Sequence, residues 1–457
     1  MTLEEILARL DVFFWGPGTL LLVLGTGVFF LIRLRFLPWR NLGYALTCAL
    51  GRDARKAAKP GTLSPFASLM TALAATIGTG NIVGVATALT AGGPGTLVWM
   101  ELTALTGMAL KYAECLLAVR FRQKNVRGEL CGGPMYVMRQ ALGPLGAVMG
   151  AAFALFAVCA SFGIGGMAQS NSIAGALRAS FGVPQGACAL AVTALVLVVM
   201  AGGVRSLGAV STALVPAMGG FYMAACLAVI AGNAAAVPEA VATILRSAVC
   251  PQAAVGGAAG TAVITLFQTI RCGVARGVFS NEAGMGSAAI ASACASTDSP
   301  ARQGYISMTG VVVDTMLICT VTGLAICCSG VLDSGAEGAE LTILAFRTVL
   351  GPLGGVFVSV AVTLFAFSTI LGWEYQGEKA FEYLSRGRGM TLYRGLFALA
   401  VYWGAGQRTE AVFLLSDICN ALMCLPNLTA LMLLSPIVVR ETLSFQSKIR
   451  AGGRKVR

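Results

Sequence analysis

Residues 65–91 read PFASLMTALAATIGTGNIVGVATALTA, an apolar stretch long enough to cross a bilayer as a helix. Its middle, ATIGTGN at residues 75–81, contains two glycines and an asparagine that predict an interruption of that helix. An interruption frees backbone N–H and C=O groups inside the hydrocarbon, which is tolerated only where those groups line a cavity or hold a ligand. We therefore expect a binding site at this break.

A second interruption is predicted in the other half of the chain, where residues 276–287 read RGVFSNEAGMGS. Paired breaks in corresponding positions of two halves are typical of an alternating-access transporter with its site between the repeats. This pair of breaks predicts both the fold and the function.

The composition is that of an integral membrane protein, with 57% hydrophobic and 11% charged residues and a mean hydropathy of +0.80. Acidic residues before the first apolar run, and no small-residue cleavage site after it, argue against a cleaved signal peptide. Apolar runs predict about eleven transmembrane helices, near residues 12–33, 65–91, 95–119, 145–177, 186–203, 209–232, 262–290, 305–328, 352–381, 392–405 and 409–436.

Lys and Arg gather in four segments, at residues 33–59, 120–139, 386–394 and 440–457. With eleven spans all four fall on one side of the membrane. The positive-inside rule therefore predicts a multi-pass protein of the plasma membrane (a bacterial-type cytoplasmic membrane), with the N-terminus outside and the C-terminus in the cytoplasm. The net charge of +12 is then loop charge facing anionic headgroups, and it requires no nucleic-acid partner.

The residue inventory argues against an enzyme. Histidine is absent, which excludes imidazole catalysis, haem ligation through His and the common zinc sites. The 14 cysteines form no C-x-x-C motif and are interpreted as small packing residues. No G-x-x-x-x-G-K-[ST] motif is present, so an ATP-driven pump is not supported. No cofactor is predicted, and no obligatory protein partner is evident.

The predicted organisation is a pair of five-helix repeats. Because each repeat has an odd number of spans, the two would insert with opposite topology, as an inverted repeat. Residues 336–350 are predicted to form an external amphipathic helix near the site, as a lid. The regions are an extra N-terminal helix with a basic cytoplasmic loop (1–64), the first repeat (65–232), an extracellular connection (233–261), the second repeat (262–436) and a basic cytoplasmic tail (437–457).

Several strings spread over most of the chain resemble those of the alanine or glycine:cation symporter family. They are ALAATIGTGNIVGVATA (72–88), GMALKYAE (107–114), GGPMYVM (132–138), GVFSNEAGMGSA (277–288), VDTMLICT (313–320) and FSTILGWEYQGEKA (367–380). The resemblance implies an all-α LeuT-type 5+5 inverted repeat that carries small amino acids inward with sodium. Glu101 departs from the expected pattern, where an apolar residue would stand; it is interpreted as snorkelling near the outer interface.

The first break is predicted to hold the substrate carboxylate. Backbone donors at the start of a half-helix, with its positive dipole end, suit an anion. The predicted cradle is Gly78, Thr79, Gly80 and Asn81, with Thr76 as an added hydroxyl. The alternative is that Gly-x-Gly only permits tight helix packing.

The second break is predicted to hold the ammonium group through freed carbonyls of Phe279, Ser280 and Asn281, with Phe279 as a wall of the pocket. Glu282 is interpreted as structural. Gln169 lies in a polar run of the fourth span, and the resemblance implies that it is a substrate ligand; it could equally bridge helices.

Ser368 and Thr369 carry hydroxyls that suit a sodium ion. In LeuT-type proteins such a pair completes a site with carbonyls of the first broken helix, here near Ala75 and Gly78. Thr369 and Trp373 lie four residues apart on one helix face, so both are predicted to contact substrate, with Trp373 limiting the pocket to small side chains.

Charged residues inside predicted spans have more than one interpretation. Asp314 is a candidate for a second cation, for a proton, or for an ion pair with Arg271 or Arg276. Lys111 and Glu114 lie three residues apart and are predicted to form an internal pair.

The sequence therefore predicts a secondary symporter for sodium and a small neutral amino acid, alanine or glycine. The alternatives are proton coupling, glutamine as substrate, or an amino-acid-gated channel or sensor.

Overall fold

The computed structural model describes residues 2–56, 61–125, 128–249, 259–406 and 410–451. The regular elements within them are helices, apart from one short antiparallel hairpin, in which β1 (Gln123–Lys124) pairs with β2 (Leu130–Cys131), and an isolated parallel bridge between Leu63 and Ala295. The elements of the N-terminal half are α1 (Leu3–Phe14), α2 (Pro17–Arg33), α3 (Leu37–Arg40), α4 (Leu42–Leu50), η1 (Arg52–Arg55), α5 (Pro65–Thr76), η2 (Thr79–Asn81), α6 (Val83–Gly92), α7 (Thr96–Arg120), α8 (Pro134–Ala141), α9 (Gly143–Ala160), η3 (Ser161–Met167), α10 (Ala168–Phe181), α11 (Gln185–Ala201) and α12 (Gly203–Gly232).

The rest of the described chain starts with short connecting helices, η4 and α13, and ends in the longest helix described, α21. Its elements are η4 (Ala234–Ala236), α13 (Val237–Ser247), α14 (Ala259–Asn281), α15 (Ser287–Ala293), α16 (Pro300–Val311), η6 (Val312–Cys319), α17 (Thr320–Cys328), η7 (Leu332–Ser334), α18 (Gly338–Leu350), α19 (Leu353–Ser385), α20 (Met390–Gly404) and α21 (Glu410–Ala451).

Seven helical segments of the described chain are long and apolar enough to cross a membrane, and three shorter apolar helices accompany them, α5, α6 and α11. The expected first span at 12–33 falls inside the first of these segments, Leu3–Arg33, which consists of α1 and α2. Proline at the first turn of α2 sets its start at Pro17, after α1 has ended at Phe14.

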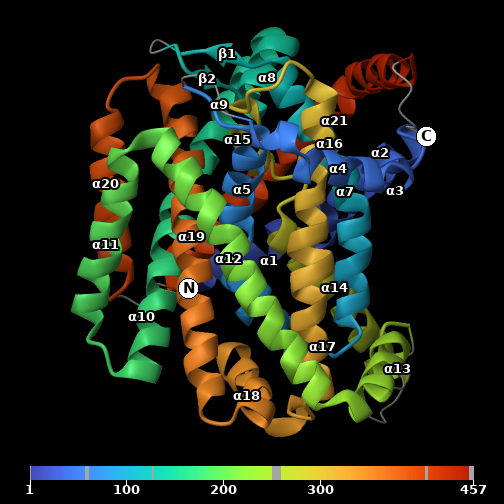
Figure 1. Cartoon of the computed structure of the whole chain (residues 1–457), viewed down its shortest axis with the longest axis vertical. Helices are drawn as coiled ribbons and strands as arrows, with labels where there is room; N and C mark the ends of the chain where they lie inside the picture. Colours follow the sequence, from blue (N-terminus) through green and yellow to red (C-terminus); the bar gives the residue numbers. More distant parts are fainter. Residues whose placement is uncertain (1, 57–60, 126–127, 250–258, 407–409, 452–457) are drawn as a thin grey trace.

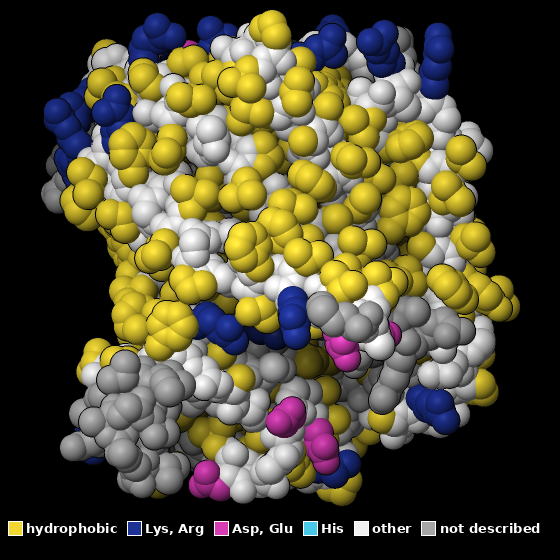
Figure 2. Space-filling model, turned by 180° about the vertical axis from the view of Figure 1, so that it is seen from behind, with side chains coloured by type: hydrophobic (Ala, Val, Ile, Leu, Met, Phe, Trp, Pro, Cys, Tyr) yellow, Lys and Arg dark blue, Asp and Glu magenta, His cyan; other side chains and the backbone are white. Residues whose placement is uncertain are grey.

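The surface is divided by polarity along the long axis of the bundle. Figure 2 shows a broad hydrophobic band with many Lys and Arg along the upper edge; below the band lie most of the visible Asp and Glu together with a few further Lys and Arg. Figure 1 places α3, α4, α8, the hairpin and the C-terminus at that upper end, and α13 and α18 at the lower one. We call the upper end the basic end. Which end faces the cytoplasm remains a prediction.

The two predicted breaks lie together in the interior. The first separates α5 from α6, and the second separates α14 from α15. α5 packs against α15, α12 and α19, while α14 packs against α6 and η2 (Figure 1). Each half of one broken helix thus contacts the other broken helix.

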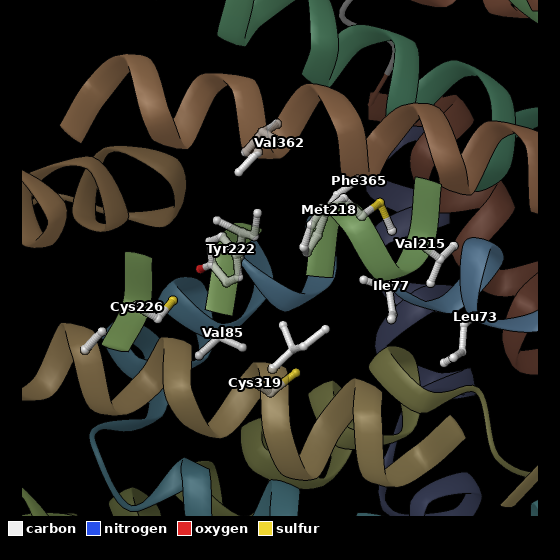
Figure 3. Packing of buried hydrophobic residues seen from close by; sticks show 14 of the residues in the cluster. Leu73, Ile77, Val85, Val215, Met218, Tyr222, Cys226, Cys319, Val362 and Phe365 are labelled. Atoms are coloured by element: carbon white, nitrogen blue, oxygen red, sulfur yellow. The ribbon is translucent and has the colours of Figure 1, made fainter. Parts of the chain in front are cut away.

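Apolar packing fixes where α5 ends. Leu73 and Ile77, in its last turn and just after it, are buried in a cluster with Val215 and Met218 of α12 and Phe365 of α19 (Figure 3). Inside a bilayer this burial stabilises the position through close van der Waals packing rather than through transfer out of water. The backbone that follows is therefore held beside α19.

The remaining expectations concern the external helix, the connection between the two repeats and the C-terminal tail. The predicted external helix at 336–350 is observed as α18, which packs against α6 and α19, with Thr342 Oγ1 3.5 Å from the carbonyl of Ile82. In the connection at 233–261, α13 is helical and residues 250–258 lie outside the described residues. α21 continues to Ala451, so the predicted tail is helical at its start.

Candidate functional site

The first break is an extended turn closed by an asparagine. After α5, Ile77 and Gly78 take extended backbone angles, and the chain returns to helix at Val83. The N–H of Gly78 donates to Oδ1 of Asn81 at 2.9 Å, so the asparagine caps the turn from within. Asn81 is fully buried, whereas Thr79 and Gly80 between them are partly exposed.

Two hydroxyls of α19 face the break. Ser368 Oγ lies 3.3 Å and Thr369 Oγ1 3.4 Å from the carbonyl oxygen of Ile77. Both hydroxyls also lie 2.8 and 3.0 Å from the carbonyl of Phe365, one helical turn earlier. A hydroxyl has one proton, so donation to the nearer carbonyl leaves oxygen lone pairs directed toward Ile77. Each hydroxyl can donate either to Phe365 or to Ile77. Where both donate to Phe365, the three oxygens present lone pairs to one another.

The carbonyl that meets the hydroxyls is that of Ile77, which lies between the two predicted positions, Ala75 and Gly78. The close approach of α19 and α5 depends on glycine. A Cβ at Gly78 would lie 2.5 Å from Thr369 Oγ1, and a Cβ at Gly372 would lie 2.4 Å from the backbone nitrogen of Ala75.

The other predicted substrate residues surround Thr79 and Gly80. Thr79 Oγ1 donates to Gln169 Oε1 at 3.2 Å, and Gln169 Nε2 donates to the carbonyl of Ile164 at 3.2 Å. Gln169 is 6% exposed and directly follows the π-helical segment η3. A Cβ at Gly80 would lie 3.8 Å from the Phe279 ring. Gln169 and Phe279 thus lie on either side of the break.

Trp373 is buried at 1% exposure and packs on Gly165, where a Cβ would come within 2.3 Å of the Trp373 Cβ. Glycine in η3 therefore admits the indole. Thr76 is 9% exposed, and its hydroxyl lies 3.4 Å from the carbonyl of Leu73.

The second break begins later than the sequence suggested. α14 continues through Asn281, so Phe279 and Ser280 belong to its last turn, where carbonyls lack an intrahelical partner. The chain then turns through positive φ at Glu282 (51°), Gly284 (94°) and Gly286 (79°). Asn281 Oδ1 accepts from the N–H of Ala283, while its Nδ2 has no hydrogen-bond partner within the described residues.

Asp314 joins the two breaks. Its Oδ1 accepts from Asn81 Nδ2 at 2.7 Å, and its Oδ2 accepts from Ser280 Oγ at 2.7 Å and Thr315 Oγ1 at 2.8 Å. It lies in the π-helical segment η6, and such segments are frequent at functional sites. Of the interpretations left open, the ion pair with Arg271 or Arg276 is not observed among the described residues.

Lys111 and Glu114 form no salt bridge within the described residues, although their charges attract each other at longer range. Lys111 Nζ is buried without a hydrogen-bond partner in the described part of the chain. Glu114 Oε1 instead accepts from the N–H of Gly286 at 3.2 Å and from Asn427 Nδ2 at 2.7 Å. Asn427 also donates to the carbonyl of Gly284 at 2.9 Å. A buried carboxylate on α7 finds more donors in the opened backbone than in one flexible ammonium group.

Sequence reasoning missed Asn427, although a polar amide beside Pro426 in an apolar run is a signal that could have found it. Glu282 is 4% exposed and accepts from Ser287 Oγ, so it has the structural position expected of it. Glu101 is partly exposed and accepts from Thr320 Oγ1 across α7 and α17, so its carboxylate is engaged between helices; its place at the outer interface stays a prediction.

Comparisons with known proteins bear on the family and the fold of the chain. The model of the sodium:alanine symporter family matches residues 1–457. The chain is 44% identical to the sodium/alanine symporter AgcS of Methanococcus maripaludis, over 97% of this chain and 98% of that protein. It is 33% identical to the probable sodium/glutamine symporter GlnT of Bacillus subtilis, over 98% of this chain and 92% of that protein.

Among solved structures, MhsT in complex with L-phenylalanine is similar with a TM-score of 0.51 at 15% identity, over 82% of this chain and 98% of that one. At this identity the likeness concerns the fold alone. The fold is of the LeuT type, as the sequence predicted.

Proposed function

Because the chain belongs to the sodium:alanine symporter family, and is therefore a multi-pass membrane protein for cation-coupled amino-acid symport, we propose that it couples inward sodium movement to uptake of alanine or glycine by alternating access. It is a transporter and not an enzyme. In the proposed orientation the basic end faces the cytoplasm, with the N-terminus outside.

The observation that carries the proposal is the convergence of Ser368, Thr369 and the Ile77 carbonyl on one point. Hydroxyl and carbonyl oxygens are hard ligands that suit a hard cation such as sodium. Carbonyls near Ala75 and Gly78 would complete the shell. A sodium ion bound here would fix the extended turn after α5, and so order the N–H groups that the substrate needs.

The substrate would lie against Thr79 and Gly80. The N–H groups that open α6 suit its carboxylate, and carbonyls ending α14, at Phe279, Ser280 and Asn281, suit its ammonium group. Asn81 and Ser280 would act through the turn they hold together with Asp314, since their side chains are already engaged with each other and with it.

The pocket would be sized by rings and a polar side chain. Phe279 and Trp373 form walls, and Gln169 orients Thr79. Walls of this kind favour a side chain no larger than a methyl group. Because ion and substrate share the turn after α5, each would raise the affinity for the other by the same factor.

Uptake of radiolabelled alanine into proteoliposomes, with and without an inward sodium gradient at constant pH and clamped potential, tests the proposal. Accumulation above equilibrium only with the sodium gradient is expected. Equilibration without accumulation would contradict sodium coupling and leave a proton gradient as the next driving force to apply.

A second candidate substrate is glutamine, favoured by the 33% identity to a probable sodium/glutamine symporter. Competition for alanine uptake by unlabelled glycine and by glutamine separates the two. We expect glycine to compete at a concentration at least tenfold below that of glutamine, and the reverse order would assign the larger substrate.

A further inference from the structure

A cavity of about 240 Å³ lies between the α11–α12 turn, α19 and the start of α20, toward the basic end. It is separate from the candidate site at the breaks. Four glutamates and two basic residues line it: Glu129, Glu374, Glu378, Glu382, Lys379 and Arg394. Carboxylates therefore outnumber basic side chains by two in a largely buried space.

The two basic residues are already engaged. Lys379 Nζ lies 2.8 Å from Glu382 Oε2 and 3.5 Å from Glu129 Oε2. Arg394 forms a bidentate pair with Glu378, with its Nε at 2.7 Å and an Nη at 2.9 Å from the two carboxylate oxygens. Arg394 therefore neutralises Glu378, and Lys379 is shared between Glu382 and Glu129.

Glu374 is the carboxylate left over. It is 6% exposed, lines the cavity, and has no ion pair among the described residues. Its Oε1 is buried without any hydrogen-bond partner in the described part of the chain. A buried carboxylate without a counter-charge is costly enough that a positive partner is required.

The nearest acidic neighbour of Glu374 is Glu378, one turn further along α19. The charged groups that face Glu374 are Glu378, Arg394 and Lys379, and the hydroxyl of Tyr393 on α20 lies 3.4 Å from its backbone carbonyl. Arg394 is occupied by both oxygens of Glu378. A small cation between the two carboxylates would satisfy the free oxygen of Glu374.

We propose that this cavity is a second cation site, in which Glu374 and Glu378 hold a monovalent cation, sodium or a proton. Glu374 lies five residues beyond Thr369 on the same helix, which is about 8 Å along its axis. The site therefore lies between the proposed sodium site and the basic end, where an ion leaving the break would next meet negative charge.

The proposal rests on cation coupling, but its test does not need transport. Equilibrium binding of radioactive sodium to the purified full chain is measured for the wild type and for Glu374→Gln. Glu382→Gln is the matched control, since it makes the same charge change on the same helix and cavity at a carboxylate already paired with Lys379. A pH indicator in weak buffer records proton release on sodium addition in parallel.

We expect Glu374→Gln to bind one sodium ion fewer than the wild type, while Glu382→Gln keeps the full number. If all three proteins bind the same number of sodium ions, but Glu374→Gln alone loses proton release, the site holds a proton and the proposal stands. The proposal is overturned if the wild type and both variants bind the same number of sodium ions and release the same number of protons. It is also overturned if Glu374→Gln and Glu382→Gln lose sodium binding equally.

Two further measurements keep the outcome clear. Thr369→Ala should bind the other sodium ion about tenfold more weakly, and the double variant with Glu374→Gln should keep only that weakened site. A wild type that binds no sodium refutes sodium coupling. Glu374 is then tested by acid titration of the same proteins, where equal proton uptake by Glu374→Gln and Glu382→Gln overturns the proposal. A cooperative thermal unfolding transition of each variant shows that it is folded.

Discussion

The two breaks differ in how their open backbone is held. Residues 77–82 of the first break contain no positive φ, whereas residues 282–286 of the second contain three. The first break meets hydroxyls of α19 and leaves Thr79 and Gly80 partly exposed. The second is buried throughout, and Glu114 and Asn427 hold its polar groups.

This difference suggests a division of roles. A turn whose polar groups are satisfied by rigid helices α7 and α21 changes little when a ligand leaves. At the first break the oxygens of Ser368, Thr369 and Ile77 lie close together, so we expect this turn to depend on a bound ion for its shape. We therefore expect changes at the second break to reduce stability, and changes at the first to reduce transport.

The largest expected effect is on stability, at the second break. Glu114→Ala leaves the N–H of Gly286 and Nδ2 of Asn427 without this acceptor in a buried site. Hydrogen bonds to a charged group contribute about 1.5–3 kcal/mol each, so the free energy of unfolding should fall by about 3 kcal/mol or more. Thermal unfolding of the purified protein measures this.

Glu114→Gln is the control for that change, because its amide oxygen still accepts from both donors. It should lose well under half as much stability. If Glu114→Ala unfolds at the wild-type temperature, the second break is not held by α7 and the division of roles fails.

The next largest effect is expected on transport, at the first break. Gly78→Ala places a Cβ 2.5 Å from Thr369 Oγ1, which must displace α19 or the turn. Sodium-driven alanine uptake should fall about 100-fold, which corresponds to about 2.8 kcal/mol. The unfolding temperature should change much less than in Glu114→Ala.

Gly80→Ala is the matched control two residues away, since its Cβ would meet only the Phe279 ring at 3.8 Å. It should keep sodium dependence and alter mainly the choice of substrate. Similar losses of sodium dependence in the two variants would show that the turn tolerates no side chain anywhere, which would remove the assignment of the ion to Gly78 and Thr369.

A smaller effect is expected from Thr369→Ala, which removes one of the three converging oxygens and leaves the backbone in place. The sodium concentration for half-maximal uptake should rise about tenfold, or about 1.4 kcal/mol, while affinity for alanine at saturating sodium changes less. Thr363→Ala is the control, because its hydroxyl donates back to Ser359 on the same helix. An unchanged sodium activation curve would refute this role for Thr369.

The two helix breaks, and their meeting in the fold, were predicted from the sequence, because glycine pairs inside apolar runs are recognisable without knowledge of their tertiary contacts. The sequence also placed the hydroxyls of Ser368 and Thr369 at the first break. The predicted carbonyl partners were those of Ala75 and Gly78, whereas in the structure the hydroxyls meet the carbonyl of Ile77. A shift of one residue in the turn changes which carbonyl faces α19, and the sequence does not determine that shift.

Contacts between residues far apart in the chain could not be predicted from the sequence. Glu114 binds Asn427, 313 positions later, and no spacing rule connects them. The i,i+3 rule suggested Lys111 instead, because that rule treats a helix surface as isolated. In the fold, the opened backbone at Gly284 and Gly286 supplies a better set of donors and acceptors than a neighbouring side chain.

The smallest expected effect concerns Trp373, which we propose as a wall of the substrate pocket. Trp373 is buried beside Gly165, so Trp373→Phe enlarges the pocket by part of one ring without removing the wall. Glutamine should then compete with alanine uptake about threefold better, since extra pocket volume changes discrimination only modestly. Trp403→Phe, at a 55% exposed position on α20, is the control and should leave selectivity unchanged. If selectivity is the same in both variants, Trp373 supports the helices without touching substrate, and the proposed preference for small side chains must come from Phe279.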